Sequence, residues 1–221
     1  MSQKKWTAVD EYIDGLLAPS DPALDAALEA IAKAGMPTIS VTASQGKFLH
    51  LLVRLRGAKK VLEIGTLGGY STIWMARALP EGGSIVTLEA DPTHARVAKS
   101  NIAHAKLTDK VDLRKGKALD ILPKLAAEKA GPFDLVFIDA DKRNNANYFD
   151  WALKLTRKGS LIIVDNVIRD GEILKANTTD ADIQGTRQLF ERIAAEPRVI
   201  PTALQTVGKK GYDGFAIALV I

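Results

Sequence analysis

The sequence contains no cysteine among its 221 residues. This absence excludes disulfides, thiolate metal sites, iron–sulfur clusters and cysteine nucleophiles. An excess of one charge is also missing, because 30 basic and 26 acidic side chains leave a formal net charge of only +4. Such a balance permits an anionic partner but does not require one. No apolar run approaches the ~20 residues that span a bilayer, so we expect no membrane partner.

The composition is that of a folded globular protein, with 47% hydrophobic and 25% charged residues. We find no repeat, low-complexity tract or Gly/Ser-rich linker that would divide the chain. The polar first 14 residues lack the apolar segment of a secretory signal, which favours a cytoplasmic location. We therefore expect one domain over residues 1–221, with N-terminal helices over 1–57 and an α/β core over 58–221.

Helical spacing of apolar residues follows Asp21 and Pro22, which are typical of an N-cap and a first helical turn. A further helix is predicted at about 44–56. From residue 60 onward, short runs that are apolar throughout alternate with helical patterns. Such runs are typical of strands buried on both faces of a parallel sheet. They lie at 61–64, 84–88, 111–114, 133–138 and 161–164. The helices between them are predicted at about 70–79, 93–105, 119–129 and 146–156.

The last part of the chain predicts a helix near 181–194 and two strands, at about 199–207 and 214–221. Residues 208–213 would join these strands as a hairpin loop, so the sheet should end in an antiparallel pair. The whole pattern predicts an α/β fold: a seven-stranded, mostly parallel, doubly wound sheet with helices on both faces and an antiparallel C-terminal hairpin.

A glycine-rich turn follows the first predicted strand. Gly65, Gly68 and Gly69 lie before the next helix, where glycine lets the backbone approach a ligand and leaves N–H groups free. The dinucleotide motif G-x-G-x-x-G is not met, because Leu67 occupies the place of its second glycine. A pyrophosphate therefore fits poorly, and the neighbouring Glu63 favours a cationic ligand.

Glu89 ends the second predicted strand, where an acid can bind both hydroxyls of a ribose. The glycine loop, the nearby carboxylate and this acid together describe S-adenosylmethionine better than NAD. That cofactor carries an ammonium and a sulfonium but no phosphate. The alternative is a tight strand–helix turn with a solvated Glu89.

Oxygen ligands occur where the fourth and fifth predicted strands end. Asp139 follows the fourth strand, and Asp165 and Asn166 follow the fifth. These side chains converge if the two strands are neighbours in a parallel sheet. Such a set prefers Mg²⁺, Mn²⁺ or Ca²⁺ over soft metals. The alternative is that the strand-end acids cap helices or turns.

These motifs give the sequence a resemblance to a known family. It resembles the cation-dependent O-methyltransferases of the caffeoyl-coenzyme A and catechol type, within the Rossmann-like class I S-adenosylmethionine-dependent methyltransferases. The resemblance runs from about residue 37 to residue 221. It rests on motifs in order and at suitable spacing: Leu62-Glu63-Ile64-Gly65 with Gly69-Tyr70-Ser71, then Phe137-Ile138-Asp139-Ala140-Asp141-Lys142, then Asp165-Asn166.

The resemblance implies a homodimer and a role for individual residues. The residues it implies as contacts of S-adenosylmethionine are Val41, Glu63, Gly65, Ser71, Glu89, Ala118 and Asp139. The divalent cation, first of all Mg²⁺, would be held by Asp139, Asp165 and Asn166. Lys142 matches the catalytic base, with Asp139 beside it. The alternative is an exposed lysine in a charged loop.

The sequence departs from the plant members of this family after the Asp-Asn pair. Those members carry a tryptophan and further recognition residues, whereas this chain has Val167-Ile168-Arg169-Asp170-Gly171. The loop that recognises coenzyme A is also short here, at about 177–182. Transfer of a methyl group to a hydroxyl of a small catechol-like ortho-diphenol therefore fits better than caffeoyl-coenzyme A.

Two other functions stay open. One is a tRNA hydroxyuridine O-methyltransferase, because relatives of this family act on tRNA. A basic cluster at Arg54, Arg56, Lys59 and Lys60 could attract phosphates, although no appended RNA-binding module is visible. The other is a non-catalytic S-adenosylmethionine-binding protein, which would have no need of a metal and a base.

Overall fold

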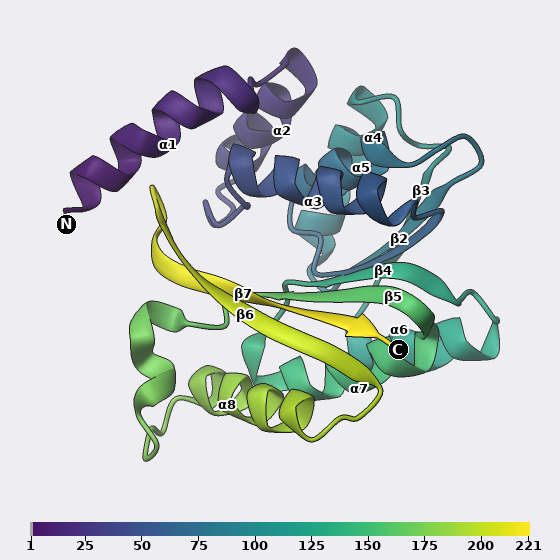
Figure 1. Ribbon diagram of the computed structural model, residues 1–221. Coiled ribbons are helices and arrows are strands. Elements are labelled where there is room, and N and C mark those ends of the chain that lie inside the picture. The colour runs from purple at the N-terminus through teal and green to yellow at the C-terminus, as the bar shows by residue number, and fades with distance from the viewer. Residues whose placement is uncertain (1) are drawn as a thin grey trace.

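The computed structural model describes residues 2–221, which form a seven-stranded sheet with helices on both faces (Figure 1). The strands are β1 (Lys60–Ile64), β2 (Ser84–Glu89), β3 (Val111–Lys115), β4 (Phe133–Ile138), β5 (Thr156–Asp165), β6 (Val199–Gly208) and β7 (Gly211–Val220). The helices are α1 (Gln3–Leu17), α2 (Pro22–Lys33), α3 (Ala43–Arg56), α4 (Tyr70–Ala78), α5 (Pro92–His104), α6 (Ala118–Ala127), α7 (Asn145–Leu155) and α8 (Ala181–Ala194). Two 3₁₀ segments, η1 (Lys142–Asn144) and η2 (Arg169–Leu174), follow β4 and β5.

The strand order is β3-β2-β1-β4-β5-β7-β6. Strands β1 to β5 pair in parallel, β7 pairs antiparallel with β5, and β6 pairs antiparallel with β7. The order changes direction between β1 and β4, which is where open α/β sheets bind their ligands. The predicted fold class is therefore confirmed, including the position of β4 beside β5.

Two element boundaries differ from the predicted ones. The hairpin loop consists of Lys209 and Lys210 alone, because β6 and β7 stay paired as far as Gly208 and Gly211. Gly211 has φ of +96°, a conformation that allows so tight a turn. Strand β5 begins at Thr156, well before the apolar run that predicted it, because the residues at its start are polar and half-exposed.

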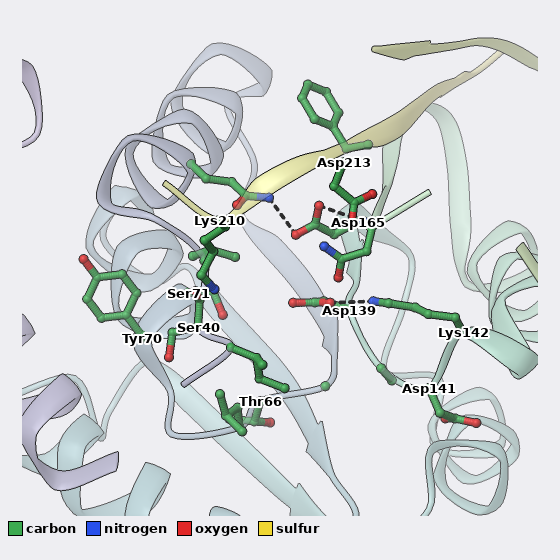
Figure 2. Close-up of a pocket in the computed structure, with 18 of the residues that line it drawn as sticks. Ser40, Thr66, Tyr70, Ser71, Asp139, Asp141, Lys142, Asp165, Lys210 and Asp213 are labelled. Atoms are coloured by element: carbon green, nitrogen blue, oxygen red, sulfur yellow. Dashed lines mark hydrogen bonds and ion pairs between the residues drawn. The ribbon is translucent and has the colours of Figure 1, made fainter. Parts of the chain in front are cut away.

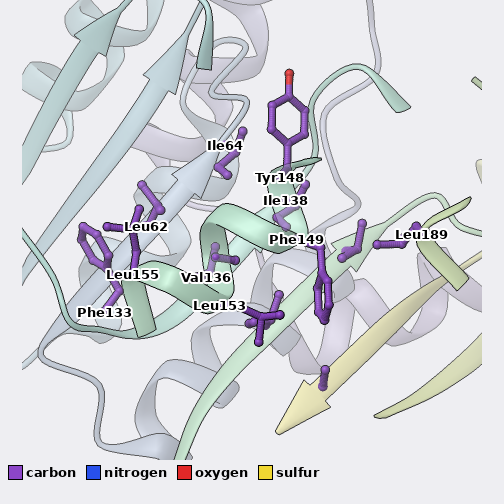
Figure 3. Packing of buried hydrophobic residues seen from close by; sticks show 14 of the residues in the cluster. Leu62, Ile64, Phe133, Val136, Ile138, Tyr148, Phe149, Leu153, Leu155 and Leu189 are labelled. Atoms are coloured by element: carbon purple, nitrogen blue, oxygen red, sulfur yellow. The ribbon is translucent and has the colours of Figure 1, made fainter. Parts of the chain in front are cut away.

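The core consists of two apolar layers, one on each face of the sheet. Successive residues of a strand point to opposite faces, so β1 sends Val61 to one layer and Leu62 to the other. Helices α3, α4 and α5 cover the first face and α6, α7 and α8 cover the second (Figure 1). Figure 3 shows the second layer, in which Phe133 and Phe149 are almost wholly buried. This double burial explains why the central strands β1 and β4 are mostly apolar.

Helices α2 and α3 begin at side-chain caps. The Asp21 carboxylate accepts the N–H groups of Ala23 (3.0 Å) and Leu24 (3.2 Å) at the start of α2. The Thr42 hydroxyl accepts the N–H of Gln45 (3.1 Å) at the start of α3. The second cap holds the entry to α3 in place.

Among the described residues, no helix is long and apolar enough to cross a membrane.

Helix α1 is bound to the tip of the C-terminal hairpin. The Gln3 amide donates to the carbonyl of Gly208 (2.8 Å), and Lys209 Nζ donates to Asp14 (2.6 Å). Asp14 also accepts the Ser44 hydroxyl of α3 (2.5 Å). Helix α1 and the C-terminal hairpin, which lie at opposite ends of the sequence, therefore meet at the hairpin tip (Figure 1).

Asp134 joins the amino ends of three strands. One of its carboxylate oxygens accepts the N–H groups of Lys59 (2.8 Å) and Lys60 (3.0 Å), and the other accepts Arg157 Nη2 (2.7 Å). Burial pushes the pKa of Asp134 upward, but these hydrogen bonds hold it below its usual value. The carboxylate thus keeps the start of β1 beside β4 and β5.

We expect Asp134→Ala to lower the free energy of unfolding by about 1–3 kcal/mol, because two backbone N–H groups lose their acceptor. Asp112→Ala is the matched control. It removes only an exposed ion pair with Arg114 and should cost less than about 1 kcal/mol. Urea denaturation of the three proteins measures both effects. Equal losses in the two variants would contradict the role given to Asp134.

Candidate active site

A cavity of about 1470 Å³ lies at the carboxyl ends of the parallel strands. Each of these strands contributes a residue from its end or just beyond it: Gly65, Glu89, Gly116, Asp139 and Asp165. The volume exceeds the ~300–1,000 Å³ of a typical small-molecule site. The cavity therefore has room for two small molecules side by side.

Gly65 sits where the backbones of two strand ends come into contact. Its N–H donates to the carbonyl of Leu88 (3.0 Å), and its φ is +100°. A Cβ atom at this position would lie 2.3 Å from the carbonyl oxygen of Asp139. Only glycine fits, so the loop after β1 can pass directly beside the loop after β4.

Glu89 holds the glycine-rich loop in its conformation. Its Oε2 accepts the N–H groups of Thr66 (3.2 Å) and Leu67 (2.7 Å), and its Oε1 accepts that of Asp91 (2.9 Å). The side chain is buried yet lines the cavity. The alternative of a solvated Glu89 is therefore wrong. Because a carboxylate oxygen has two lone pairs, Oε1 keeps the capacity to accept one more donor.

Glu63 lies behind the cavity wall rather than in it. Its carboxylate is fully buried and accepts the hydroxyls of Ser71 (2.6 Å), Thr87 (2.6 Å) and Thr72. Burial raises the pKa of Glu63 to about 7, and the three hydroxyls limit that rise. Ser71 lines the cavity, so it separates Glu63 from any bound ligand. The other six predicted cofactor contacts all line the cavity: Val41, Gly65, Ser71, Glu89, Ala118 and Asp139.

The acidic end of the cavity is formed by neighbouring strand ends. The register pairs Ile138 of β4 with Val164 of β5, so Asp139 and Asp165 lie next to each other. Asp165 is 4% exposed. Burial and the nearby Asp139 carboxylate raise the pKa of Asp165 to about 7. A cation placed beside these two acids would favour their charged forms.

Lys142 supplies one positive charge at this end. Its Nζ donates to Asp139 Oδ1 at 2.6 Å (Figure 2). The lysine is 7% exposed, so the interpretation as an exposed lysine is wrong. Segment η1, which starts at Lys142, directs the side chain back toward the strand end.

Asn166 completes the predicted oxygen set and lines the cavity with φ of 56°. Its N–H donates to Asp165 Oδ1 (2.8 Å). Among residues 2–221, no three His, Cys, Asp or Glu side chains form a group that could hold a metal ion. A cation site here would thus depend on an amide oxygen beside two carboxylates.

Two further residues reach the acidic end from distant parts of the chain. Gln45 Nε2 of α3 donates to Asp165 Oδ2 (2.6 Å), across 120 residues of sequence. Lys210, at the hairpin tip, donates to the carbonyl of Ser40 and lines the cavity. No local motif marks either residue, because only the tertiary structure brings them to the strand ends.

Comparison with known proteins identifies the family. A family model described as O-methyltransferase matches residues 18–218. The chain belongs to the O-methyltransferase family. A catechol O-methyltransferase of Niastella koreensis is 55% identical over 220 residues, covering 100% of both chains. One from Mycobacterium tuberculosis is 53% identical over 212 residues, covering 96% of this chain and 94% of its own. The crystal structure of an O-methyltransferase from Bacillus cereus in complex with SAH has a TM-score of 0.98 and 55% identity, with full coverage of both chains.

These findings confirm the resemblance and the prediction of an S-adenosylmethionine-dependent O-methyltransferase. They leave no support for the alternative of a non-catalytic binding protein.

The buried Glu63 predicts a pH dependence of stability. Its pKa is higher in the folded protein (about 7) than the usual 4.5, so the folded state holds the proton more tightly. The contribution of this proton to the stability of the folded state is complete below pH 4.5 and is lost as the pH rises to about 7. As the pH rises over this interval, the free energy of unfolding of Glu63→Gln should increase by about 2–3 kcal/mol relative to that of the unmodified protein, since the amide cannot ionise. Urea denaturation at several pH values measures the difference.

Glu81→Gln, at an exposed turn, is the control and should show no such trend. A constant difference between Glu63→Gln and the unmodified protein from pH 4.5 to 7 would refute the assignment of the raised pKa to Glu63.

Proposed function

We propose that this O-methyltransferase transfers a methyl group from S-adenosylmethionine to one hydroxyl of a small ortho-diphenol, and that the reaction requires a divalent cation. The observation that carries the proposal is the position of the partly buried Asp139 next to the buried Asp165 and Lys142, at the end of one large cavity. The names of the Niastella and Mycobacterium relatives support the acceptor class.

S-adenosylmethionine would occupy the part of the cavity near β1, β2 and β3. The free lone pair of Glu89 Oε1 suits a ribose hydroxyl, and Ala118 at the start of α6 offers an apolar contact for adenine. Gly65 and Ser71 would face the methionine part, with Val41 covering it from the entry to α3. The S-adenosylhomocysteine in the Bacillus structure supports a cofactor of this kind.

The residues at the acidic end fit a hard divalent cation. Asp139, Asp165 and Asn166 supply only oxygen donors, which Mg²⁺ prefers. Burial and then the Asp139 carboxylate raise the pKa of Asp165, and a bound cation would oppose both effects. When bound, the cation would favour ionisation of the acceptor hydroxyl and hold both hydroxyls of the diphenol.

Lys142 would accept the proton of the acceptor hydroxyl at its Nζ, in its neutral form. Asp139 Oδ1 holds that nitrogen in place at 2.6 Å. The phenolate oxygen then attacks the methyl carbon while the carbon–sulfur bond breaks, leaving S-adenosylhomocysteine. Because the sulfonium is a good leaving group, we assign most of the rate to positioning.

The position of the basic cluster favours a small acceptor over tRNA. Arg54 and Arg56 lie in the last turn of α3, and Lys59 and Lys60 lie at the amino end of β1. The cavity opens at the carboxyl ends of the strands, so this cluster is at the opposite edge of the sheet. Phosphates bound there would lie away from Lys142.

We expect Lys142→Ala to lower turnover of catechol by about 10²–10⁴-fold, because the base assigned to remove the proton is lost. Binding of S-adenosylhomocysteine, measured by calorimetry, should stay within a factor of about 3, since the lysine is not among the predicted cofactor contacts. Lys154→Ala removes an exposed lysine of α7 and serves as the control. Turnover of Lys142→Ala at the unmodified rate would rule out the role of the lysine as base.

Removal of divalent cations should abolish methyl transfer to catechol, and added Mg²⁺ should restore it. Asp165→Asn should need a Mg²⁺ concentration at least about 10-fold higher than the unmodified enzyme to restore activity, because one anionic ligand is lost. Transfer of a labelled methyl group to catechol and, in parallel, to bulk tRNA measures both points. Activity that survives EDTA would contradict the cation, and labelled tRNA without labelled catechol would favour the RNA function.

A further inference from the structure

Arg169 is a cavity residue that the reaction described above does not use. It begins η2, three positions after Asn166, and lines the cavity. The chain from Asn166 can extend at most about 11 Å over three residues. The backbone of Arg169 is therefore close enough to Asn166, a predicted cation ligand, for one small aromatic molecule to contact both residues.

The backbone at Arg169 is strained. Arg169 and Asp170 both have φ of 55°, and Gly171 follows with φ of 80°. Residues with a side chain rarely adopt this conformation, and two in succession need support from their surroundings. Asp213 gives that support, because its Oδ1 accepts the N–H groups of Ile168 (3.0 Å) and Arg169 (3.0 Å). Figure 2 shows Asp213 next to Asp165.

The guanidinium has a buried donor without an acceptor. Among the described residues, Nε of Arg169 is buried and has no hydrogen-bond partner. The acids of the neighbouring segments are already engaged: Glu172 pairs with Lys175 (2.6 Å) and Asp182 with Arg143 (3.2 Å). Oδ1 of Asp213 accepts three backbone N–H groups, those of Ile168, Arg169 and Gly214. A charged side chain without an acceptor is unfavourable, and because Arg169 lines the cavity, a ligand there could supply an acceptor to its guanidinium.

The two lysines near the same end of the cavity differ from Arg169. Lys142 is paired with Asp139, and Lys210 donates to the carbonyl of Ser40. Each ammonium still has further N–H donors, but among the described residues Arg169 differs in that its side chain has no acceptor in the protein at all. The surroundings, with Asp139, Asp165 and Asp213, would repel an anion that had no cation to receive it.

We propose that Arg169 binds a carboxylate of the acceptor, so that the preferred substrates are ortho-diphenols with an acidic substituent. The planar guanidinium can take a carboxylate through two parallel hydrogen bonds, a geometry that a lysine cannot match. A neutral catechol would leave the guanidinium without an acceptor. This inference rests on the proposed function, because it specifies the class of ortho-diphenol.

The test compares 3,4-dihydroxybenzoate with its methyl ester, which has the same ring and hydroxyls but no charge. The unmodified enzyme should have the higher kcat/KM for the acid. Arg169→Gln should lower kcat/KM for the acid by about 10- to 100-fold, mainly through KM, and change that for the ester by less than about 3-fold. Arg169→Lys should recover only part of the loss. Lys175→Gln, in the same loop, is the control and should match the unmodified enzyme.

Calorimetric titration of both compounds into enzyme saturated with S-adenosylhomocysteine and Mg²⁺ gives a readout that needs no turnover. Tighter binding of the acid than of the ester, lost in Arg169→Gln, supports the carboxylate site. If the acid binds in this way but neither compound is methylated, only the proposed function has failed. Methylation of the ester with no preference for the acid overturns the role of Arg169 and leaves the proposed function standing. Equal losses for acid and ester, or a weaker affinity for S-adenosylmethionine, also overturn it.

Discussion

The proximity of Asp139 and Asp165 is the constraint on which the rest of the site depends. Two carboxylates meet because β4 and β5 are parallel neighbours in the register that pairs Ile138 with Val164. Their mutual repulsion and the burial of Asp165 are costly, and the molecule offsets the cost with Lys142 at one acid and Gln45 at the other. The cavity opens beside this pair, so any ligand there meets a concentrated negative charge held in a fixed place.

The opposite end of the cavity, near the loop after β1, is held in place by hydrogen bonds to the backbone. Glu89 accepts three backbone N–H groups and fixes the glycine-rich loop, while Gly65 lets that loop pass beside the loop after β4. Glu63 acts from behind the wall, through the hydroxyl of Ser71. One end is therefore shaped mainly by backbone geometry and the other by charge. This division suits an uncharged adenosine and a cation-bound phenol in one cavity.

Several features could be predicted because their signals are local. Apolar runs marked the buried strands, and the acids at their ends could be located once β4 and β5 were expected to be neighbours. The start of β5 could not, because its first residues are polar. They are attached to β4 by tertiary contacts, among them those of Arg157 with Asp134 and of the buried Ser160 with Phe133. Glu63 was predicted to contact the cofactor from its motif alone. Its position behind Ser71 follows from the alternation of side chains along β1, which turns it into the layer beneath α4.

The amino-acid sequence by itself determined the order of strands and helices, the glycine that the loop after β1 requires, and an all-oxygen set of strand-end residues in a chain without cysteine. Those properties depend on residue type and on neighbours along the chain. The tertiary structure alone decided that Gln45 and Lys210 reach the acidic end, that Lys142 is buried against Asp139, and that Arg169 lines the cavity on a strained turn. Burial and pairing are properties of distant segments packed together, and no local pattern encodes which of them will meet.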